Sequence, residues 1–165
     1  MQKFSLKVLL TAATALSAIT IAPAQAASGN GDATVQVLQA FTLAKTSDLG
    51  FGKLIPSAAA GTINIAEDGT RTCAASLTCF GTTSAGGFSI SGSSGETVSV
   101  GLDSDTITLT NGASATISGK ISTSSKALTL EAGQASFKIA GLLSVGANQA
   151  GGTYRGQYAV SVNYQ

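Results

Sequence analysis

Alternation of apolar and polar residues with a period of two runs through most of the chain, and it restricts the possible folds more than any other feature. Beyond the N-terminal region, no segment repeats apolar residues at the i, i+3, i+4 and i+7 positions of an amphipathic helix. A period of two places one face of a strand on a core and the other face in water. Connections rich in Gly, Ser, Asn and Asp supply the turns, so the sequence predicts an all-β sandwich or barrel. The predicted strands are residues 33–43, 49–55, 61–66, 87–92, 97–102, 106–110, 115–121, 127–131, 135–143 and 153–164.

The composition excludes several functional classes. Only 10% of the residues are charged, against ~25% in an average soluble domain, and the formal net charge is +1. A nucleic-acid-binding protein needs a basic surface to neutralise phosphates, so no nucleic-acid partner is expected. The chain has no His and therefore lacks the central residue of Ser-His-Asp, Cys-His and His-metal sites. We predict no catalytic residue, no cofactor, no metal and no enzymatic activity.

Two carboxylates, Asp103 and Asp105, lie on either side of a serine at the end of a predicted strand. Such a pair on one strand face can bind Ca²⁺ or act as an acid–base pair. No third ligand or glycine-spaced loop follows them. We therefore interpret both as solvated surface residues.

Residues 1–26 have the three parts of a secretory signal peptide. Two lysines lie within the first seven residues, residues 8–22 are apolar, and residues 23–27 (Pro-Ala-Gln-Ala-Ala) provide small residues for cleavage. A transmembrane anchor is the alternative, but the apolar stretch is shorter than the ~20 residues that span a bilayer. We expect cleavage after Ala26 and export to the periplasm, cell surface or extracellular space. No membrane span should then remain, and residues 27–165 should form one domain.

The chain has two cysteines, Cys73 and Cys79. In an oxidising compartment an even pair predicts a disulfide. Closing a loop of seven residues stabilises the fold by ~2.4 kcal/mol on the loop-closure model, so the bond would act as a local clip. Two buried thiols are the alternative.

One hairpin can be placed in register from the pattern around residues 111–113, Asn-Gly-Ala. A loop of two residues would pair core residues with polar ones. A loop of three residues pairs Leu109 with Ala115 and Ile107 with Ile117. Because a slip of one residue moves every side chain to the opposite face, we predict the three-residue loop, with the glycine in the left-handed conformation.

The last predicted strand is the longest amphipathic segment. Over residues 154–164 the even positions are Tyr, Gly or Val, whereas the odd positions are polar or Ala. The three tyrosines could form a sugar-stacking face, but they share the parity of the two valines, so we expect them in the core. No later strand follows to pair with the edge of this one, and an open apolar edge promotes association. Either an earlier strand or a second chain should cover it.

This C-terminal pattern resembles that of chaperone–usher pilus subunits, in which a glycine fourteen residues from the end precedes an alternating strand with a penultimate tyrosine. Here Gly152 is fourteenth from the end and Tyr164 is penultimate. Over residues 33–165 the chain also resembles the exported bacterial proteins of domain-of-unknown-function family 4402. An early Asp-Leu-x-Phe-Gly element is similar to a stretch in archaic-type pilins related to spore coat protein U. The matching residues are Asp48, Leu49, Phe51, Gly52, Gly152, Tyr154, Gly156, Tyr158, Val160, Val162, Asn163 and Tyr164.

The resemblance implies an immunoglobulin-like (pilin-like) antiparallel β-sandwich that lacks its last strand. The open groove would be filled by β-strand addition, first from a periplasmic chaperone and then from another subunit, with an outer-membrane usher as a further partner. The implied assembly edge consists of Gly152, Tyr154, Gly156, Tyr158, Val160, Val162 and Tyr164.

The donated strand should be an N-terminal segment with alternating apolar residues. The alternation is interrupted at Leu38, and only residues 27–32 precede the segment, too few for a separate donor. Either residues 33–43 are donated, which predicts a pilin-like subunit assembling with other copies into a surface filament or layer, or they are the first strand of a complete domain. The second alternative predicts a self-complete secreted or cell-surface binding module of unknown ligand. The candidate donor residues are Val35, Val37, Phe41 and Leu43.

Overall fold

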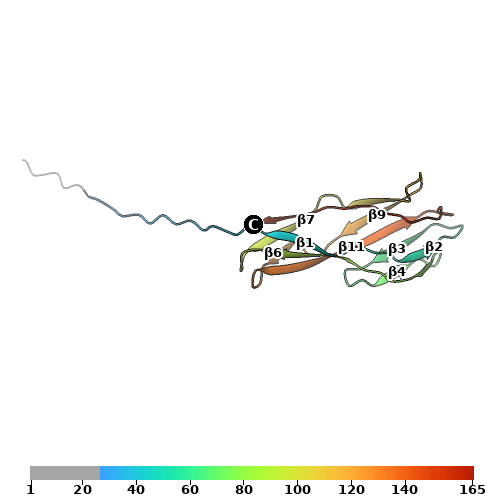
Figure 1. Cartoon of the computed structure of the whole chain (residues 1–165), viewed down its shortest axis with the longest axis horizontal. Helices are drawn as coiled ribbons and strands as arrows, with labels where there is room; N and C mark the ends of the chain where they lie inside the picture. The colour runs from blue at the N-terminus through green and yellow to red at the C-terminus, as the bar shows by residue number, and fades with distance from the viewer. Residues whose placement is uncertain (1–26) are drawn as a thin grey trace, which may run out of the picture. The chain divides into compact units, whose positions relative to one another are not determined.

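A computed structural model describes residues 27–165 (Figure 1). The predicted signal peptide and its cleavage site lie outside the described residues. Residues 36–165 form one unit, and the described residues before Gln36 belong to another. Residues 27–40 have no regular secondary structure, so the residues after them form the fold.

Regular structure between residues 27 and 165 is entirely β, and no helix occurs in this range. Paired strands run antiparallel throughout. The predicted all-β, antiparallel fold class is therefore confirmed. The strands are β1 (Thr42–Ser47), β2 (Lys53–Ile55), β3 (Gly61–Ile65), β4 (Arg71–Cys73), β5 (Thr78–Phe80), β6 (Gly86–Ser91), β7 (Thr97–Leu102), β8 (Thr106–Thr110), β9 (Thr116–Ser122), β10 (Ala127–Thr129), β11 (Gln134–Val145) and β12 (Val160–Tyr164).

The long strand β11 organises the larger sheet. Its first half pairs with β6, from Gln134 opposite Ser91 to Ile139 opposite Gly86. Its second half lies between β3 and β9. The larger sheet has the order β1-β6-β11-β3-β4, with β9 also beside β11 and β8 beside β9. A smaller sheet has the order β10-β7-β12, and β2 pairs with β5.

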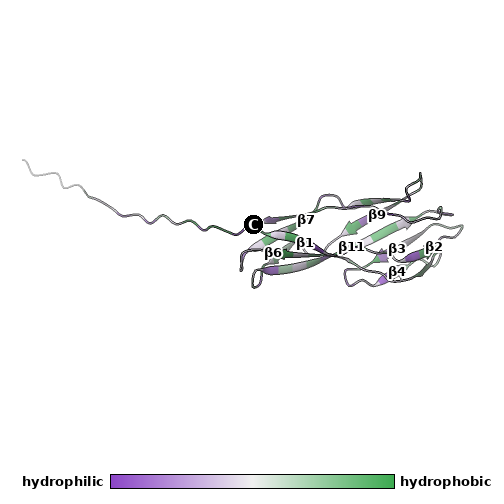
Figure 2. Ribbon diagram, viewed as in Figure 1, coloured by the Kyte–Doolittle hydropathy of each residue, from purple (hydrophilic) through white to green (hydrophobic). Residues whose placement is uncertain are grey.

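One hydrophobic core joins the two sheets. Ile90 and Ile139 of the larger sheet belong to the same buried cluster as Val98 of the smaller sheet. Phe137 of β11 stacks on Phe88 of β6 with ring centroids 5.4 Å apart. Hydrophobic and hydrophilic residues both occur along individual strands such as β9 (Figure 2), because each strand turns one face to this core.

The register predicted for the hairpin between β8 and β9 is wrong by two residues. Leu109 pairs with Ile117, not Ala115, and Ile107 pairs with Gly119. The loop covers residues 111–115 and is closed by a backbone hydrogen bond of 3.2 Å across its ends. A shift of two residues leaves every side chain on its predicted face, so alternation cannot distinguish the two registers. The left-handed conformation of the glycine, at φ 80°, is as predicted.

The last strand is shorter than predicted. β12 covers Val160–Tyr164, and an isolated bridge joins Arg155 to Thr110 earlier in the segment. The C-terminal segment thus pairs first with β8 and then with β7. Residues 103–105 connect β7 to β8 outside both strands, and at this connection the C-terminal segment changes its partner strand.

Candidate functional site

The C-terminal segment is hydrogen-bonded along one edge through its odd-numbered residues. Arg155 exchanges two backbone hydrogen bonds of 2.9 Å with Thr110. The carbonyl of Ala159 accepts a bond of 3.2 Å from the N–H of Asp103, and the N–H of Gln165 donates to a β7 carbonyl at 3.0 Å. In an antiparallel pair, the residues bonded to the neighbour alternate with residues that are not. The backbone groups of the even-numbered residues therefore point away from β7 and β8.

No described strand pairs with the opposite edge of β12. β12 ends the order β10-β7-β12, and β1 ends the order of the larger sheet. The backbone N–H and C=O groups of Val160, Val162 and Tyr164 have no backbone partner among the described residues. We call these three residues the open edge. An unpaired strand edge is a template for pairing with another chain, and within the described part of the chain no earlier strand covers it.

An apolar pocket of about 910 Å³ lies at the start of the C-terminal segment, where Tyr154 contributes to its lining. Residues 149–154 form one side and residues 49–54 form another. Most of the apolar side chains that line it also pack in, or against, the hydrophobic core, whereas Phe80 is exposed. We call it the Tyr154 pocket. Its main apolar lining residues are Phe51, Leu54, Leu109, Ile117, Leu143 and Tyr154.

The end of the segment is held by a cluster of contacts around Tyr164. Its hydroxyl donates to the carbonyl of Gln39 at 2.8 Å and accepts a bond of 3.1 Å from the N–H of Ser93. The N–H of Gln39 donates to the Ser93 hydroxyl at 2.8 Å. The ring of Tyr164 meets that of Phe41 edge-on, with centroids 5.3 Å apart. We call these four residues the Tyr164 clasp.

Tyr158 lies between the Tyr154 pocket and the Tyr164 clasp and packs against the larger sheet. Its ring meets Phe88 edge-on at 6.2 Å. A Cβ atom on Gly86 would lie 2.2 Å from the Tyr158 hydroxyl, so the glycine makes room for the phenol. Burial raises the pKa of Tyr158, and the carboxylate of Asp48 raises it further.

The two glycines of the predicted assembly edge have structural roles. Gly152 lines the Tyr154 pocket and has a positive φ of 149°. A Cβ on Gly156 would lie 2.5 Å from the carbonyl oxygen of Thr108. Gly156 thus permits close backbone approach to β8. The tyrosines and valines of this edge pack in, or against, the core, as their parity predicts.

The structure divides the four candidate donor residues into two groups. Val35 and Val37 lie outside any strand and are 87% and 86% exposed. Phe41 and Leu43 are half-buried against the core, and Leu43 lies in β1 opposite Ile90. The strand predicted over residues 33–43 therefore begins only at Thr42. The break in the alternation at Leu38 separates the two exposed valines from the two half-buried residues.

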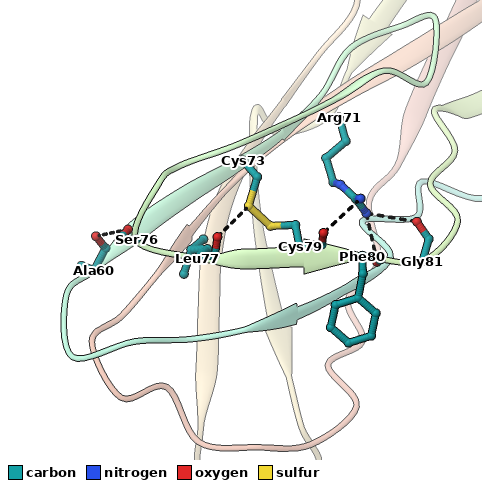
Figure 3. Close-up of a disulfide and its surroundings, with 8 residues drawn as sticks. All are labelled: Ala60, Arg71, Cys73, Ser76, Leu77, Cys79, Phe80 and Gly81. Atoms are coloured by element: carbon teal, nitrogen blue, oxygen red, sulfur yellow. Dashed lines mark hydrogen bonds between the residues drawn. A yellow bond between two sulfur atoms is a disulfide. The ribbon is translucent and has the colours of Figure 1, made fainter.

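The predicted disulfide between Cys73 and Cys79 is confirmed (Figure 3). It joins β4 to β5, beside the guanidinium of Arg71, which donates to the carbonyls of Phe80 at 3.0 Å and Gly81 at 3.1 Å. These contacts fix the β2–β5 pair, whose neighbouring residues form part of the Tyr154 pocket.

The pair Asp103 and Asp105 does not lie on a strand face as expected. Both residues are exposed in the connection between β7 and β8. Within residues 27–165, no group of three or more His, Cys, Asp or Glu side chains is arranged to hold a metal ion. The same residues include no helix long and apolar enough to cross a membrane.

Comparison with known protein families gives a match. The model of the family described as domain of unknown function DUF4402 matches residues 41–164. The match starts at Phe41 of the Tyr164 clasp and ends at Tyr164 itself, so it covers the whole β-sandwich and leaves the exposed valines outside. No curated protein matches the chain. The family match covers well over half of the sequence, and the chain belongs to the DUF4402 family.

Proposed function

We propose that this protein is an exported, non-enzymatic structural subunit, similar to a pilin, that assembles by β-strand addition into a surface filament or layer. The observation that carries the proposal is the combination of an unpaired strand edge with an exposed, alternating segment in the same chain. The open edge has no strand beside it, and the segment around Val35 and Val37, with its alternating apolar residues, pairs with no strand among the described residues.

Strand addition would give the open edge hydrogen-bond partners and would bury the exposed valines of the added segment. Each backbone hydrogen bond made to the open edge contributes ~0.5–1.5 kcal/mol net. A valine side chain moved from water into an apolar groove adds about 1.5–3 kcal/mol when fully buried. Val35 and Val37 share one parity and would enter the groove together, while Thr34 and Gln36 would remain in water.

A dedicated chaperone and an outer-membrane usher fit this proposal as partners. A chaperone strand on the open edge would prevent premature association during export. The resemblance to chaperone–usher subunits is the support for these two partners.

The Tyr154 pocket favours a second candidate, a self-complete binding module. Its volume of about 910 Å³ lies within the range of small-molecule sites, and its lining is apolar with Lys53 and Gln149 nearby. In this alternative the pocket takes an apolar ligand and the open edge stays unpaired.

Native material from the producing cells separates the two candidates. Size-exclusion chromatography, unheated gel electrophoresis and electron microscopy should reveal filaments or a ladder of oligomers that heating converts to monomers. The double variant Val35→Ser/Val37→Ser should be monomeric. The matched control Thr34→Ser/Leu38→Ser changes residues of the opposite parity and should still assemble. Native material that remains monomeric at all concentrations would contradict the proposal.

A further inference from the structure

We propose that the Tyr154 pocket binds a small amphipathic carboxylate, with the apolar body of the ligand inside the pocket and its anionic group beside Lys53. The inference rests on the second candidate function, the binding module, and adds the chemical class of the ligand and the residue that selects it. It does not depend on the open edge, because none of the three residues of that edge lines the pocket.

The floor of the pocket is apolar. Ile117 and Leu143, both buried, line it together with the half-buried Leu109. The volume of about 910 Å³ is large enough for a drug-sized molecule. Because burial of apolar surface is the main favourable contribution to such binding, the floor favours a ligand with an apolar body.

The polar side chains on one wall are satisfied within the protein. The Tyr154 hydroxyl donates to the carbonyl of Ala150 at 2.7 Å and accepts a bond of 2.8 Å from the side-chain amide of Gln149. The same amide donates to a β9 carbonyl at 3.1 Å, and its oxygen accepts a bond of 3.3 Å from the N–H of Gly146. Both amide hydrogens of Gln149 are therefore used. Neither Gln149 nor Tyr154 needs a polar group on the ligand.

The charge around the pocket is positive. In the part of the chain that the structure describes, Lys53 is the one charged residue of the lining, and no carboxylate lies within ion-pair distance of its amine. The guanidinium of Arg71 lies behind the wall, where a Cβ on Gly52 would be 2.9 Å from it. Asp48, which precedes the lining residues, is ion-paired with Lys45. An anionic group at Lys53 would thus meet a cation without a competing carboxylate in the lining.

Lys53 lies at the rim of the pocket. It is exposed and pairs in register with Phe80, a lining residue that is 45% exposed. A lysine can lay its apolar stem along such a surface while its amine stays in water. An anionic group at the rim also stays partly hydrated, which avoids the cost of burying a charge. A carboxylate at one end of an apolar body meets both conditions.

The rim is held in place before any ligand binds. The disulfide joins β5 to β4, and Arg71 donates to the carbonyls of Phe80 and Gly81, both of which line the pocket (Figure 3). A preformed site loses less conformational freedom on binding than a flexible one. The pocket can therefore bind a small ligand without a large rearrangement of its rim.

A matched pair of photoaffinity probes tests the ligand class and the site together. 4-Benzoylbenzoate has an apolar body with a carboxylate at one end, and 4-benzoylbenzamide has the same body with a neutral amide. Isothermal titration calorimetry with the full exported chain should show about fivefold tighter binding of the carboxylate, as expected for an ion pair at a partly exposed site. Added salt should reduce this preference, because ions screen exposed charges. After irradiation, mass spectrometry should locate both probes on lining residues such as 49–54 and 149–154.

Substitutions at Lys53 test the selecting residue. Lys53→Met keeps the apolar stem and removes the charge, so it should abolish the preference for the carboxylate and leave the affinity for the amide unchanged. Lys53→Arg should retain the preference. Lys138→Met is the matched control, because Lys138 is exposed on β11 and does not line the pocket, and it should bind both probes as the native chain does. A preference that Lys53→Met does not reduce would overturn the inference.

The inference and the candidate function on which it rests fail in different ways. Equal binding of the two probes inside the pocket would overturn the ligand class and leave the binding module standing. Crosslinks outside the lining, or no binding of either probe, would overturn the inference and remove the support for the binding module. Assembly is measured separately by chromatography and electron microscopy, and none of these outcomes decides it.

Discussion

β11 and β12 are both alternating apolar strands, yet their surroundings differ. β11 has neighbours on both edges, β6 and β3 on one and β9 on the other. β12 has β7 on one edge and no described strand on the other. Alternation reports which face of a strand is buried and says nothing about whether both edges are paired. The unpaired edge of β12 is the feature on which the proposed function rests.

The largest expected effect is the loss of packing at β11. Ile139→Ala removes most of a side chain that is fully buried between the sheets and should lower the free energy of unfolding by ~2–5 kcal/mol. In β12 the Val160 side chain is only half-buried, so Val160→Ala should lower the free energy of unfolding of the monomer by clearly less than Ile139→Ala does. Urea denaturation of both variants checks this difference, and equal losses would indicate that β12 is as fully enclosed as β11.

A pair of proline substitutions tests the edges directly. Ser161→Pro removes an N–H on the β7 side of β12 and should destabilise the monomer by ~1–3 kcal/mol through the lost bond. Val160→Pro removes an N–H of the open edge, which has no partner in the monomer. It should therefore lower the free energy of unfolding of the monomer by less than Ser161→Pro does, and it should impair assembly. Thermal unfolding and chromatography separate the two effects. A larger stability loss for Val160→Pro would mean that the open edge is already paired.

The contact between the C-terminal segment and the larger sheet can be tested at a glycine. Gly86→Ala places a methyl group against the Tyr158 hydroxyl and should cost ~1–3 kcal/mol by overpacking. Gly151→Ala is the control, because a Cβ there has no neighbour within 4 Å, and it should change stability by less than ~0.5 kcal/mol. Chemical denaturation gives both values. Tolerance of Gly86→Ala would show that Tyr158 is not seated on β6.

The smallest effect concerns pH. Because burial raises the pKa of Tyr158, the folded state favours the neutral phenol over the phenolate. This contribution to stability is fully present below the ordinary tyrosine pKa of ~10 and is lost as the pH rises through the higher folded value. Between about pH 8 and 11, the free energy of unfolding should fall more steeply with pH in the native protein than in Tyr158→Phe. Identical slopes would contradict the burial of this hydroxyl.

The sequence predicted the fold class, the disulfide and the core-facing parity of the C-terminal tyrosines and valines. These features depend on local patterns that a strand displays in its own residues. The hairpin register at Leu109 was missed because a two-residue shift preserves every face. The short strands β4 and β5 were missed because their sequences, Arg-Thr-Cys and Thr-Cys-Phe, do not alternate between apolar and polar residues. The disulfide and Arg71 help to hold these strands in place.

The candidate site was only partly predictable. The residues of the open edge follow from parity, but the absence of a neighbour for β12 within the described chain depends on how all the strands are ordered. The Tyr154 pocket combines residues from six separate segments, and most of its apolar residues follow the same sequence pattern as fully buried core residues. The break in alternation at Leu38 indicated where the N-terminal segment ends. The pattern alone did not show whether the residues before or after the break belong to the folded domain.

Residue-resolved amide hydrogen exchange in the isolated monomer tests the open edge most directly. The amides of Ser161, Asn163 and Gln165 face β7 and should be protected, whereas those of Val160, Val162 and Tyr164 should exchange at rates near those of unstructured chain. On assembly, the second group should become protected as well. Strong protection of Val160, Val162 and Tyr164 in the monomer would show that β12 already has two neighbours, and the assembly proposal would fail.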